Sequence, residues 1–389
     1  MNCSWTLGSG CNRLDAAGGA AMGKPVLMMR GFGLIELMVA MTLGLLLTVG
    51  ILTLYLDMSR SSAELAKTNL QIENGRLAIQ LLRDDLVHAG FWNGFIPEFD
   101  DLTLETVPVD YPATLPAPCA AYSTWTASFK GDLLGTGVQL YSGVPTGCES
   151  ALPDAVVGSD VLLVRHAQTC VAGVGNCEAD TSDKLYFQTS QCEGEARYVL
   201  ADSGFTLHKR DCTTAAEKRK FVNSIYYLRD YAVSPGDGIP TLMQSSFDLV
   251  SGNLTQQPAV AMIEGVQAMR FELGVDNISD SGAAVNYSQA VLWADTTEPI
   301  VKDSPTNRGD GAADAFCTSG TCTLDDMLNS VQIKVHLLVR DLEPSQGYSS
   351  DKTYSLAGST LGPYSDNFKR HVYATTVRLS NISGRRETP

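Results

Sequence analysis

Three residues near the N-terminus, Gly31, Phe32 and Glu36, have types and spacing that could support a proteolytic step followed by an ion pair. Glu36 is the one charged residue between Arg30 and Asp57. A carboxylate in hydrocarbon costs about 2.5–3.5 kcal/mol at a helix centre and less near a helix end. Cleavage after the small residue Gly31 would create a charged amine on Phe32, one helical turn before Glu36. That amine, from the same chain or from a neighbour, could pair with the carboxylate and set the register of packing.

The segment after Glu36 is long enough to cross a membrane. Residues 37–56 contain no charge, and as a helix they would span about 30 Å, the thickness of bilayer hydrocarbon. Lys24 and Arg30 precede the segment, so the positive-inside rule places the N-terminus in the cytoplasm and the bulk of the chain outside. A secretory signal is the alternative, but its cleavage site would follow the apolar run, whereas Gly31 precedes it. A Glu36 side chain that merely snorkels to the membrane interface is the alternative to the ion pair.

The composition excludes some function classes. The chain has 389 residues, of which 44% are hydrophobic and 18% charged, as in ordinary globular proteins. Its formal net charge of −15 gives no reason to expect nucleic acid as a partner, because phosphate binding depends on Lys and Arg. The sequence lacks the common nucleophile, phosphate-binding, zinc-protease and dinucleotide motifs, and its five histidines are scattered. We therefore predict that the chain is not an enzyme.

The cysteines indicate an oxidising compartment. Cys3 and Cys11 stand alone near the start, and an even set of eight follows in loop-like surroundings, which favours disulfides. Pairing of sequence neighbours closes the smallest loops, although other pairings are open. Zinc is the alternative, but no two cysteines have the C-x-x-C spacing. The neighbour pairs are Cys119 with Cys148, Cys170 with Cys177, Cys192 with Cys212, and Cys317 with Cys322.

The stretch "RGFGLIELMVAMTLGLLL" resembles the prepilin cleavage and methylation motif of type IV pilins and type II secretion pseudopilins. The resemblance implies that Gly31 precedes the scissile bond, that Phe32 becomes the N-methylated first residue, and that Glu36 is the assembly carboxylate. Gly33 departs from the motif, since Thr or Ser is commoner there. The leader is also unusually long, and we expect the true start at Met22, in which case Cys3 and Cys11 are never made.

The remainder of the chain is similar to the PilW minor pilins, beginning with the stretch at residues 72–95. The smaller pseudopilin J of type II secretion is the nearest alternative, and a membrane-anchored adhesin or binding module is a third. The PilW resemblance implies a pilus subunit that primes assembly and contributes to the tip complex. It implies these partners: prepilin peptidase, other minor pilins, the major pilin, the inner-membrane assembly platform, inner-membrane lipid and a large tip adhesin. The further similar segments are residues 159–168, 225–232, 263–276, 331–341 and 369–381.

The pattern of residues predicts an α+β fold in which a long helix packs on a mainly antiparallel β-sheet head with disulfide-containing loop insertions. Leu65, Ile72, Ile79 and Leu86 recur every seven residues, with Leu70 and Leu77 beside them, and we expect this stripe to lie against the head. Gly90 should end the helix at about Ala89. We predict a leader at 1–31, a transmembrane helix at 32–56, its amphipathic continuation at 57–90 and a head at 91–389. The predicted strands are 160–165, 196–200, 224–229, 269–275, 331–340 and 372–379.

One loop has the oxygen ligands of a weak calcium site. Asp276, Asn277 and Asp280 lie close together after a predicted strand, and such groups suit calcium. The loop lacks the spacing and the final Glu of an EF-hand, and clusters of this kind are usually solvated turns. We predict no other cofactor.

Overall fold

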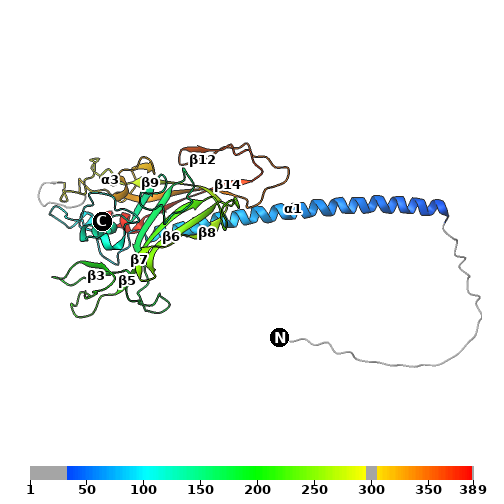
Figure 1. Cartoon of the computed structure of the whole chain (residues 1–389). Helices are drawn as coiled ribbons and strands as arrows, with labels where there is room; N and C mark the ends of the chain where they lie inside the picture. The colour runs from blue at the N-terminus through cyan, green and yellow to red at the C-terminus, as the bar shows by residue number, and fades with distance from the viewer. Residues whose placement is uncertain (1–32, 295–304, 388–389) are drawn as a thin grey trace, which may run out of the picture. The chain divides into compact units, whose positions relative to one another are not determined.

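The computed structural model describes residues 33–294 and 305–387. It contains one long helix, α1 (Leu34–His88), followed by a β-rich region (Figure 1). The chain divides into two compact units, residues 1–61 and residues 62–389, so α1 begins in the first unit and ends in the second. The predicted leader, residues 1–31, lies outside the described residues, as does Phe32.

Helix α1 ends where the sequence predicts. Its last helical residue is His88, and Gly90 follows with a φ of +71°, a conformation that glycine adopts without steric cost. The N–H group of Gly90 donates a hydrogen bond to the carbonyl of Arg165, 2.9 Å away. The chain therefore leaves the helix directly alongside a strand of the head.

The larger of the two main sheets has eight strands, all paired antiparallel. Its path runs β1-β2-β5-β3-β4, while β6 pairs with β5 and also with β7 and β8. The strands are β1 (Val138–Tyr141), β2 (Val161–Ala167), β3 (Tyr186–Thr189), β4 (Tyr198–Ala201), β5 (Lys218–Arg229), β6 (Thr241–Val250), β7 (Asn253–Gln256) and β8 (Val260–Glu264).

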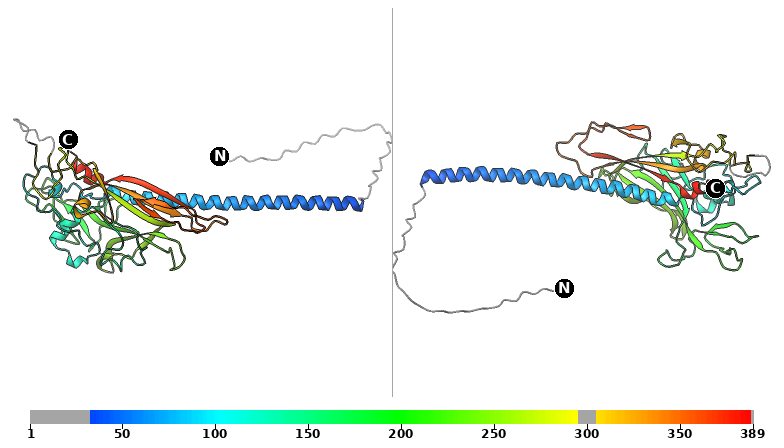
Figure 2. Two further views of the ribbon diagram at one scale, coloured as in Figure 1. Left: turned by 90° about the horizontal axis from the view of Figure 1, so that it is seen from above. Right: turned by 180° about the vertical axis from the view of Figure 1, so that it is seen from behind.

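The smaller sheet has four strands in the order β10-β9-β11-β14, which are β10 (Ala315–Thr318), β9 (Val266–Val275), β11 (Ser330–Arg340) and β14 (Arg370–Arg378). Strand β14, drawn in orange-red, forms one edge of this sheet (Figure 2). A separate hairpin is made by β12 (Tyr354–Leu356) and β13 (Ser359–Leu361).

Short helices occupy the long connections. Two single 3₁₀ turns, η1 (Glu98–Asp100) and η2 (Tyr122–Thr124), precede α2 (Ala127–Gly135). A capping box formed by Thr323 and Asp326 begins α3 (Leu324–Leu328), and α4 (Ser380–Arg386) follows the last strand. The segments that we expected to be loop insertions, residues 97–155 and 280–325, therefore contain helices and strands, and both belong to the second compact unit.

The C-terminal half of α1 packs between the two sheets. Ala78, Leu82 and Leu86 share one hydrophobic core with residues of β1, β2 and β5 from the larger sheet and of β9, β11 and β14 from the smaller one. Alternate residues of β11, including Ile333 and Val335, face this core, as their period-two pattern predicts. The predicted α+β architecture is confirmed.

The predicted apolar stripe of the helix was only partly right, since Leu86 is in the core and Ile79 packs against it. The residues of α1 that are buried are Gln71, Gly75, Ala78, Leu82 and Leu86, so only Leu86 belongs to the expected set. Leu65, Leu70 and Leu77 are exposed, while Ile72 and Ile79 are half-buried. The buried face differs from the predicted one because it carries the smallest residues of the helix, which let the sheet approach most closely. The Tyr373 ring lies directly against Gly75.

All six predicted strands exist, as β2, β4, β5, β9, β11 and β14, with ends shifted by at most six residues. Strand β6, which has ten residues, was not predicted, and neither were the short strands β1, β3, β7, β8, β10, β12 and β13. Strand β6 has three consecutive polar residues, Gln244, Ser245 and Ser246, and the buried Ser245 hydroxyl donates a hydrogen bond to the Gln257 carbonyl. A strand whose buried side chains are polar and hydrogen-bonded cannot be predicted from a hydrophobic pattern.

Candidate functional site

The first candidate site is the start of α1, where Glu36 lies in the first helical turn. Its Oε2 atom accepts a hydrogen bond from the backbone N–H of Gly33, 3.0 Å away. The carboxylate therefore turns back toward the helix N-terminus, where the helix dipole favours negative charge. The predicted processing residues Gly31 and Phe32 lie outside the described residues, so the pairing of Glu36 with the Phe32 amine stays a prediction.

The surface of α1 beyond Glu36 is apolar and exposed. This helix is long and apolar enough to cross a membrane by length and composition, with a mean hydropathy of 2.3 over its most apolar window. Large apolar side chains from Leu34 to Met58 are exposed within the described chain. The hydroxyls of Thr42, Thr48 and Thr53 each donate to a carbonyl three or four residues earlier, so these polar groups are satisfied within the helix.

The second feature is the set of polar contacts that anchor α1 to the head. The Gln71 side-chain amide donates to the carbonyls of Val339 and Lys369, both 3.0 Å away. Glu64 accepts hydrogen bonds from Lys369 Nζ and from the Ser345 hydroxyl, each at 2.6 Å. These contacts lower the pKa of Glu64 to about 2, with the Lys369 bond the largest cause. The helix is therefore fixed at its entry to the head by hydrogen bonds as well as by apolar packing.

A polar network fixes the other end of the helix. Asp85 Oδ1 lies 2.9 Å from His166 Nε2, and Asp85 Oδ2 accepts a hydrogen bond from the Tyr226 hydroxyl at 3.0 Å. The second ring nitrogen of His166, Nδ1, lies 2.8 Å from the carbonyl of Ala167. Burial, followed by the Asp85 charge, raises the pKa of Tyr226. The network links α1 to β2 and β5, and the histidine has a structural role as a hydrogen-bond partner of Asp85.

A third polar cluster joins the C-terminal helix to the chain after α1. Asp100 is buried and binds the guanidinium groups of Arg385 and Arg386, with nitrogen–oxygen distances of 2.8 and 2.9 Å. Burial by itself would raise the pKa of Asp100, but the two arginines hold it below its usual value. Arg386 also donates to the Leu328 carbonyl. These ion pairs thus join α4 to the segment that follows α1, although the two are far apart in the sequence.

Four disulfides cross-link the head, and they are the neighbour pairs that the sequence predicts. They join Cys119 to Cys148, Cys170 to Cys177, Cys192 to Cys212, and Cys317 to Cys322. Each closes a short stretch of chain, with sequence separations between 5 and 29 residues. Cys317 lies in strand β10 and the other seven of these cysteines lie in the connections between elements, with Cys148 buried in a hydrophobic cluster.

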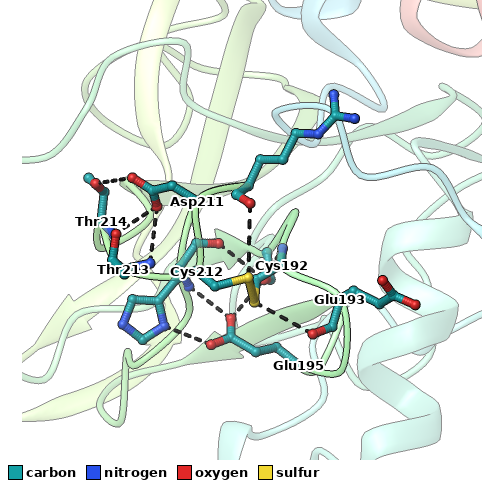
Figure 3. The surroundings of a disulfide bond; sticks show 10 residues. Cys192, Glu193, Glu195, Asp211, Cys212, Thr213 and Thr214 are labelled. Carbon is teal, nitrogen blue, oxygen red and sulfur yellow. Dashed lines mark hydrogen bonds and ion pairs between the residues drawn. A yellow bond between two sulfur atoms is a disulfide. The ribbon is translucent and has the colours of Figure 1, made fainter.

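The Cys192–Cys212 disulfide closes a loop that two carboxylates also hold (Figure 3). Glu195 accepts hydrogen bonds from the backbone N–H and from the ring of His208, at 2.9 and 2.7 Å, and the ring contact is the main reason that its pKa falls to about 2. Asp211 accepts hydrogen bonds from the Thr214 hydroxyl, which is the main reason that its pKa falls, and from the backbone N–H groups of Thr214 and Thr213. This cluster has a structural role in the loop.

The candidate calcium residues Asp276 and Asp280 differ in their surroundings. Asp276 is buried and accepts a hydrogen bond from the N–H of Gly311, and burial is the main reason that its pKa rises to about 6. Asp280 lies in the exposed turn that follows. Across residues 33–294 and 305–387, no three His, Cys, Asp or Glu side chains are grouped so that they could hold a metal ion.

Comparisons with known proteins agree with the resemblance read from the sequence. Residues 225–381 match the family model described as PilW, type IV pilus-assembly protein W. This match spans strands β5 to β14, which include all of the smaller sheet. Among solved structures, a type IV-like pilin from Thermus thermophilus aligns at 11% identity and a TM-score of 0.27, covering 64% of this chain and 84% of that one. No curated protein sequence matches the chain.

Proposed function

We propose that this chain, which belongs to the PilW family of type IV pilus-assembly proteins, is a minor pilin that enters the fibre through helix α1. The prepilin peptidase would cut after Gly31 and methylate Phe32. The new amine of Phe32 would then pair with Glu36 of the same subunit or of a neighbour. In this role the chain is a structural subunit and a peptidase substrate, and the α1 surface is its assembly interface.

The single observation that carries this proposal is the position of Glu36. It is a lone carboxylate in the first turn of an apolar helix, and it turns toward the helix N-terminus, where the processed amine would lie. A helix whose only task was to anchor a head in the membrane would gain nothing from this charge, because the charge makes insertion less favourable. In an assembly interface the same charge has a use, because a buried ion pair fixes the register between subunits.

The proposed location follows from the same helix. Before assembly, α1 would hold the chain in the inner membrane with its N-terminus in the cytoplasm and its β-rich head in the periplasm. The four disulfides support an oxidising location for the head. After assembly, the head would lie on the pilus fibre, with a role in priming and in the tip complex that bears on adhesion and motility. Its proposed partners are the other pilins, the assembly platform and a large tip adhesin.

Substitution of Glu36 tests the proposal. Glu36→Ala should leave cleavage intact and reduce the amount of the chain in sheared fibres at least about tenfold, whereas Glu36→Asp, which keeps the charge, should reduce it less. Glu73→Ala, an exposed carboxylate on the same helix, is the matched control and should incorporate normally. Incorporation of Glu36→Ala at the normal level would overturn the proposal.

A further inference from the structure

The free edge of strand β14 lies next to a groove on the head. A cavity of about 580 Å³ runs between the C-terminal half of α1 and β14, and residues 373–375 form its strand side. On the helix side it is lined by Arg76, Ile79, Arg83 and Val87, among others. All of these residues belong to the second compact unit.

The helix and the strand run side by side along the groove. At one end, Gln71 of the helix donates to the Lys369 carbonyl, 3.0 Å away. At the other end, the Asn381 side chain donates to the Val87 carbonyl, also at 3.0 Å. The helix therefore lies beside the strand, and the groove borders the strand at residues 373–375.

The outer edge of β14 offers unpaired backbone groups. β14 pairs with β11 on one side, and on its other side it pairs with none of the described strands. Leu379 donates its N–H to β11, and Lys369 accepts from Asp341, so the odd-numbered residues between them point their backbone groups toward the sheet. In an antiparallel ladder without a bulge, the even-numbered residues Val372, Ala374 and Thr376 then point theirs outward.

This edge is the longest in the described chain. Strand β14 has nine residues, whereas the edge strands β1, β4, β7 and β10 have four each. Soluble proteins normally protect long edges with proline, a bulge or a covering loop. Residues 370–378 contain no proline, and their register with β11 has no bulge. The edge thus has the form of a template for another strand.

The charges of the groove indicate which kind of strand it fits. Arg76 and Arg83 are exposed, and neither side chain donates a hydrogen bond to, or forms an ion pair with, any described residue. They lie two helical turns apart, about 10 Å along the axis. Asp84 also lines the groove, so two arginines and one aspartate give it a net positive charge in a chain whose net charge is −15.

We propose that the groove binds an extended, acidic segment of another protein chain, which adds to β14 as a strand. Its backbone pairs with Val372, Ala374 and Thr376, and two carboxylates on its helix-facing side bind Arg76 and Arg83. Side chains on one face of a strand recur every two residues, so these carboxylates lie two or four residues apart. The inference rests on the proposed function only in making the partner another subunit of the assembly.

A second copy of this chain fits the groove less well. Strand β14 itself contains no acidic residue, and its two arginines, Arg370 and Arg378, form ion pairs with Asp366 and Glu387 outside the strand. Pairing of two β14 edges would therefore bring no carboxylate of the strand to Arg76 and Arg83 of the other copy. Opposite charges across a pair of strands are favourable, so charge favours an acidic partner over self-association.

Peptide binding to the full chain in detergent tests this inference without any fibre. The probe is a fluorescent peptide of alternating Thr and Val with two Glu on one face, four residues apart, and the matched peptide has Lys in place of Glu. Fluorescence anisotropy should detect binding of the acidic peptide and at least about tenfold weaker binding of the Lys peptide. Replacement of Arg76 and Arg83 by Gln should weaken binding of the acidic peptide by about tenfold or more, whereas Arg210→Gln, an exposed arginine elsewhere on the head, should not.

A backbone variant tests the strand pairing separately. Ala374→Pro removes an N–H that points away from β11, so the ladder with β11 keeps its bonds. This variant should lose binding by about tenfold, while Ala374→Val should retain it. Absence of binding by the acidic peptide, equal binding of both peptides, or unchanged binding by the arginine and proline variants would overturn the inference. Dimers of the chain that Ala374→Pro dissociates would overturn it in favour of self-pairing.

The two proposals fail separately. Peptide binding is measured on the isolated full chain, whereas the proposed function is measured by incorporation into fibres. Normal incorporation without peptide binding would remove the groove inference alone. Peptide binding by a chain that never enters fibres would remove the minor-pilin proposal alone.

Discussion

The carboxylate of Asp85 on α1 lies 2.9 Å from Nε2 of His166 on β2, and its second oxygen accepts a hydrogen bond from Tyr226 on β5. One helical side chain thus binds two strands of the larger sheet. The preceding residue, Asp84, is exposed, and its carboxylate has no partner among the described residues. The two adjacent aspartates therefore provide a matched pair for experiment.

Replacement of Asp85 by Ala should lower the free energy of unfolding by about 3 kcal/mol, because it leaves the buried His166 ring without its partner. Asp84→Ala should change it by less than about 0.5 kcal/mol, as is usual for exposed sites. Thermal unfolding of the full chain in detergent compares the two variants. Equal midpoints for both would show that the network does not hold the helix on the head.

Close contact of the helix with β14 predicts the effect of a substitution at Gly75. A Cβ atom there would lie 2.3 Å from the Tyr373 ring, so the ring must move even though alanine favours the helix more than glycine does. Gly75→Ala should destabilise the chain by about 1–3 kcal/mol. Adding Tyr373→Ala should recover part of the loss caused by Gly75→Ala, and this coupling is measured with a double-mutant cycle. Independent effects of the two changes would mean that the ring does not pack on Gly75.

The sequence predicted helix α1 but not which of its faces is buried. The existence and the end of α1 were predictable from its composition and from Gly90, but its buried face was not. The recurring Leu and Ile residues predicted one face, whereas the face with Gly75 and Ala78 is buried because it lets the sheets approach more closely. For the same reason the sequence could not distinguish Asp85 from Asp84, since the choice depends on the rotation of the helix.

The disulfide pairs were predictable because each closes a short segment of chain, and short segments restrict which sulfurs can meet. The polar anchors were not predictable, since Gln71, Glu64 and Asp100 find partners far away in the sequence. Their types give no signal of burial. Only the tertiary structure brings Asp100 to the two arginines of α4.

Loop length predicts how much each disulfide stabilises the head. Replacing Cys119 and Cys148 by Ala opens a loop of 29 residues and should cost about 3.6 kcal/mol by chain entropy. Replacing Cys317 and Cys322 opens a loop of 5 residues and should cost about 2 kcal/mol. Thermal midpoints of the two double variants provide the comparison. A lower midpoint for the shorter loop would contradict the entropic account.

The raised pKa of Asp276 predicts that the stability of the chain depends on pH. Burial, the largest cause, raises the pKa of this carboxyl from 3.8 to about 6, so the folded chain holds its proton more tightly than the unfolded chain does. Its contribution to stability is therefore present below about pH 4 and is lost as the pH rises through 6. Asp276→Asn should match the native chain near pH 4 and become more stable than it by about 2 kcal/mol at pH 7.

The control for this prediction is Asp351→Asn, which replaces an exposed carboxylate. Its thermal midpoint should follow that of the native chain at every pH. A constant difference between Asp276→Asn and the native chain from pH 4 to pH 7 would mean that Asp276 does not titrate in this range.

The N-terminus of the chain in assembled fibres tests the central claim most directly. Fibres are sheared from cells, the subunit is isolated, and its N-terminal peptide is analysed by mass spectrometry. We predict a mature chain that begins at Phe32 and carries one methyl group on its amine, one helical turn from Glu36. A fibre subunit that retains residues 22–31 would contradict the account, because no amine would then be available at Phe32 to pair with the carboxylate.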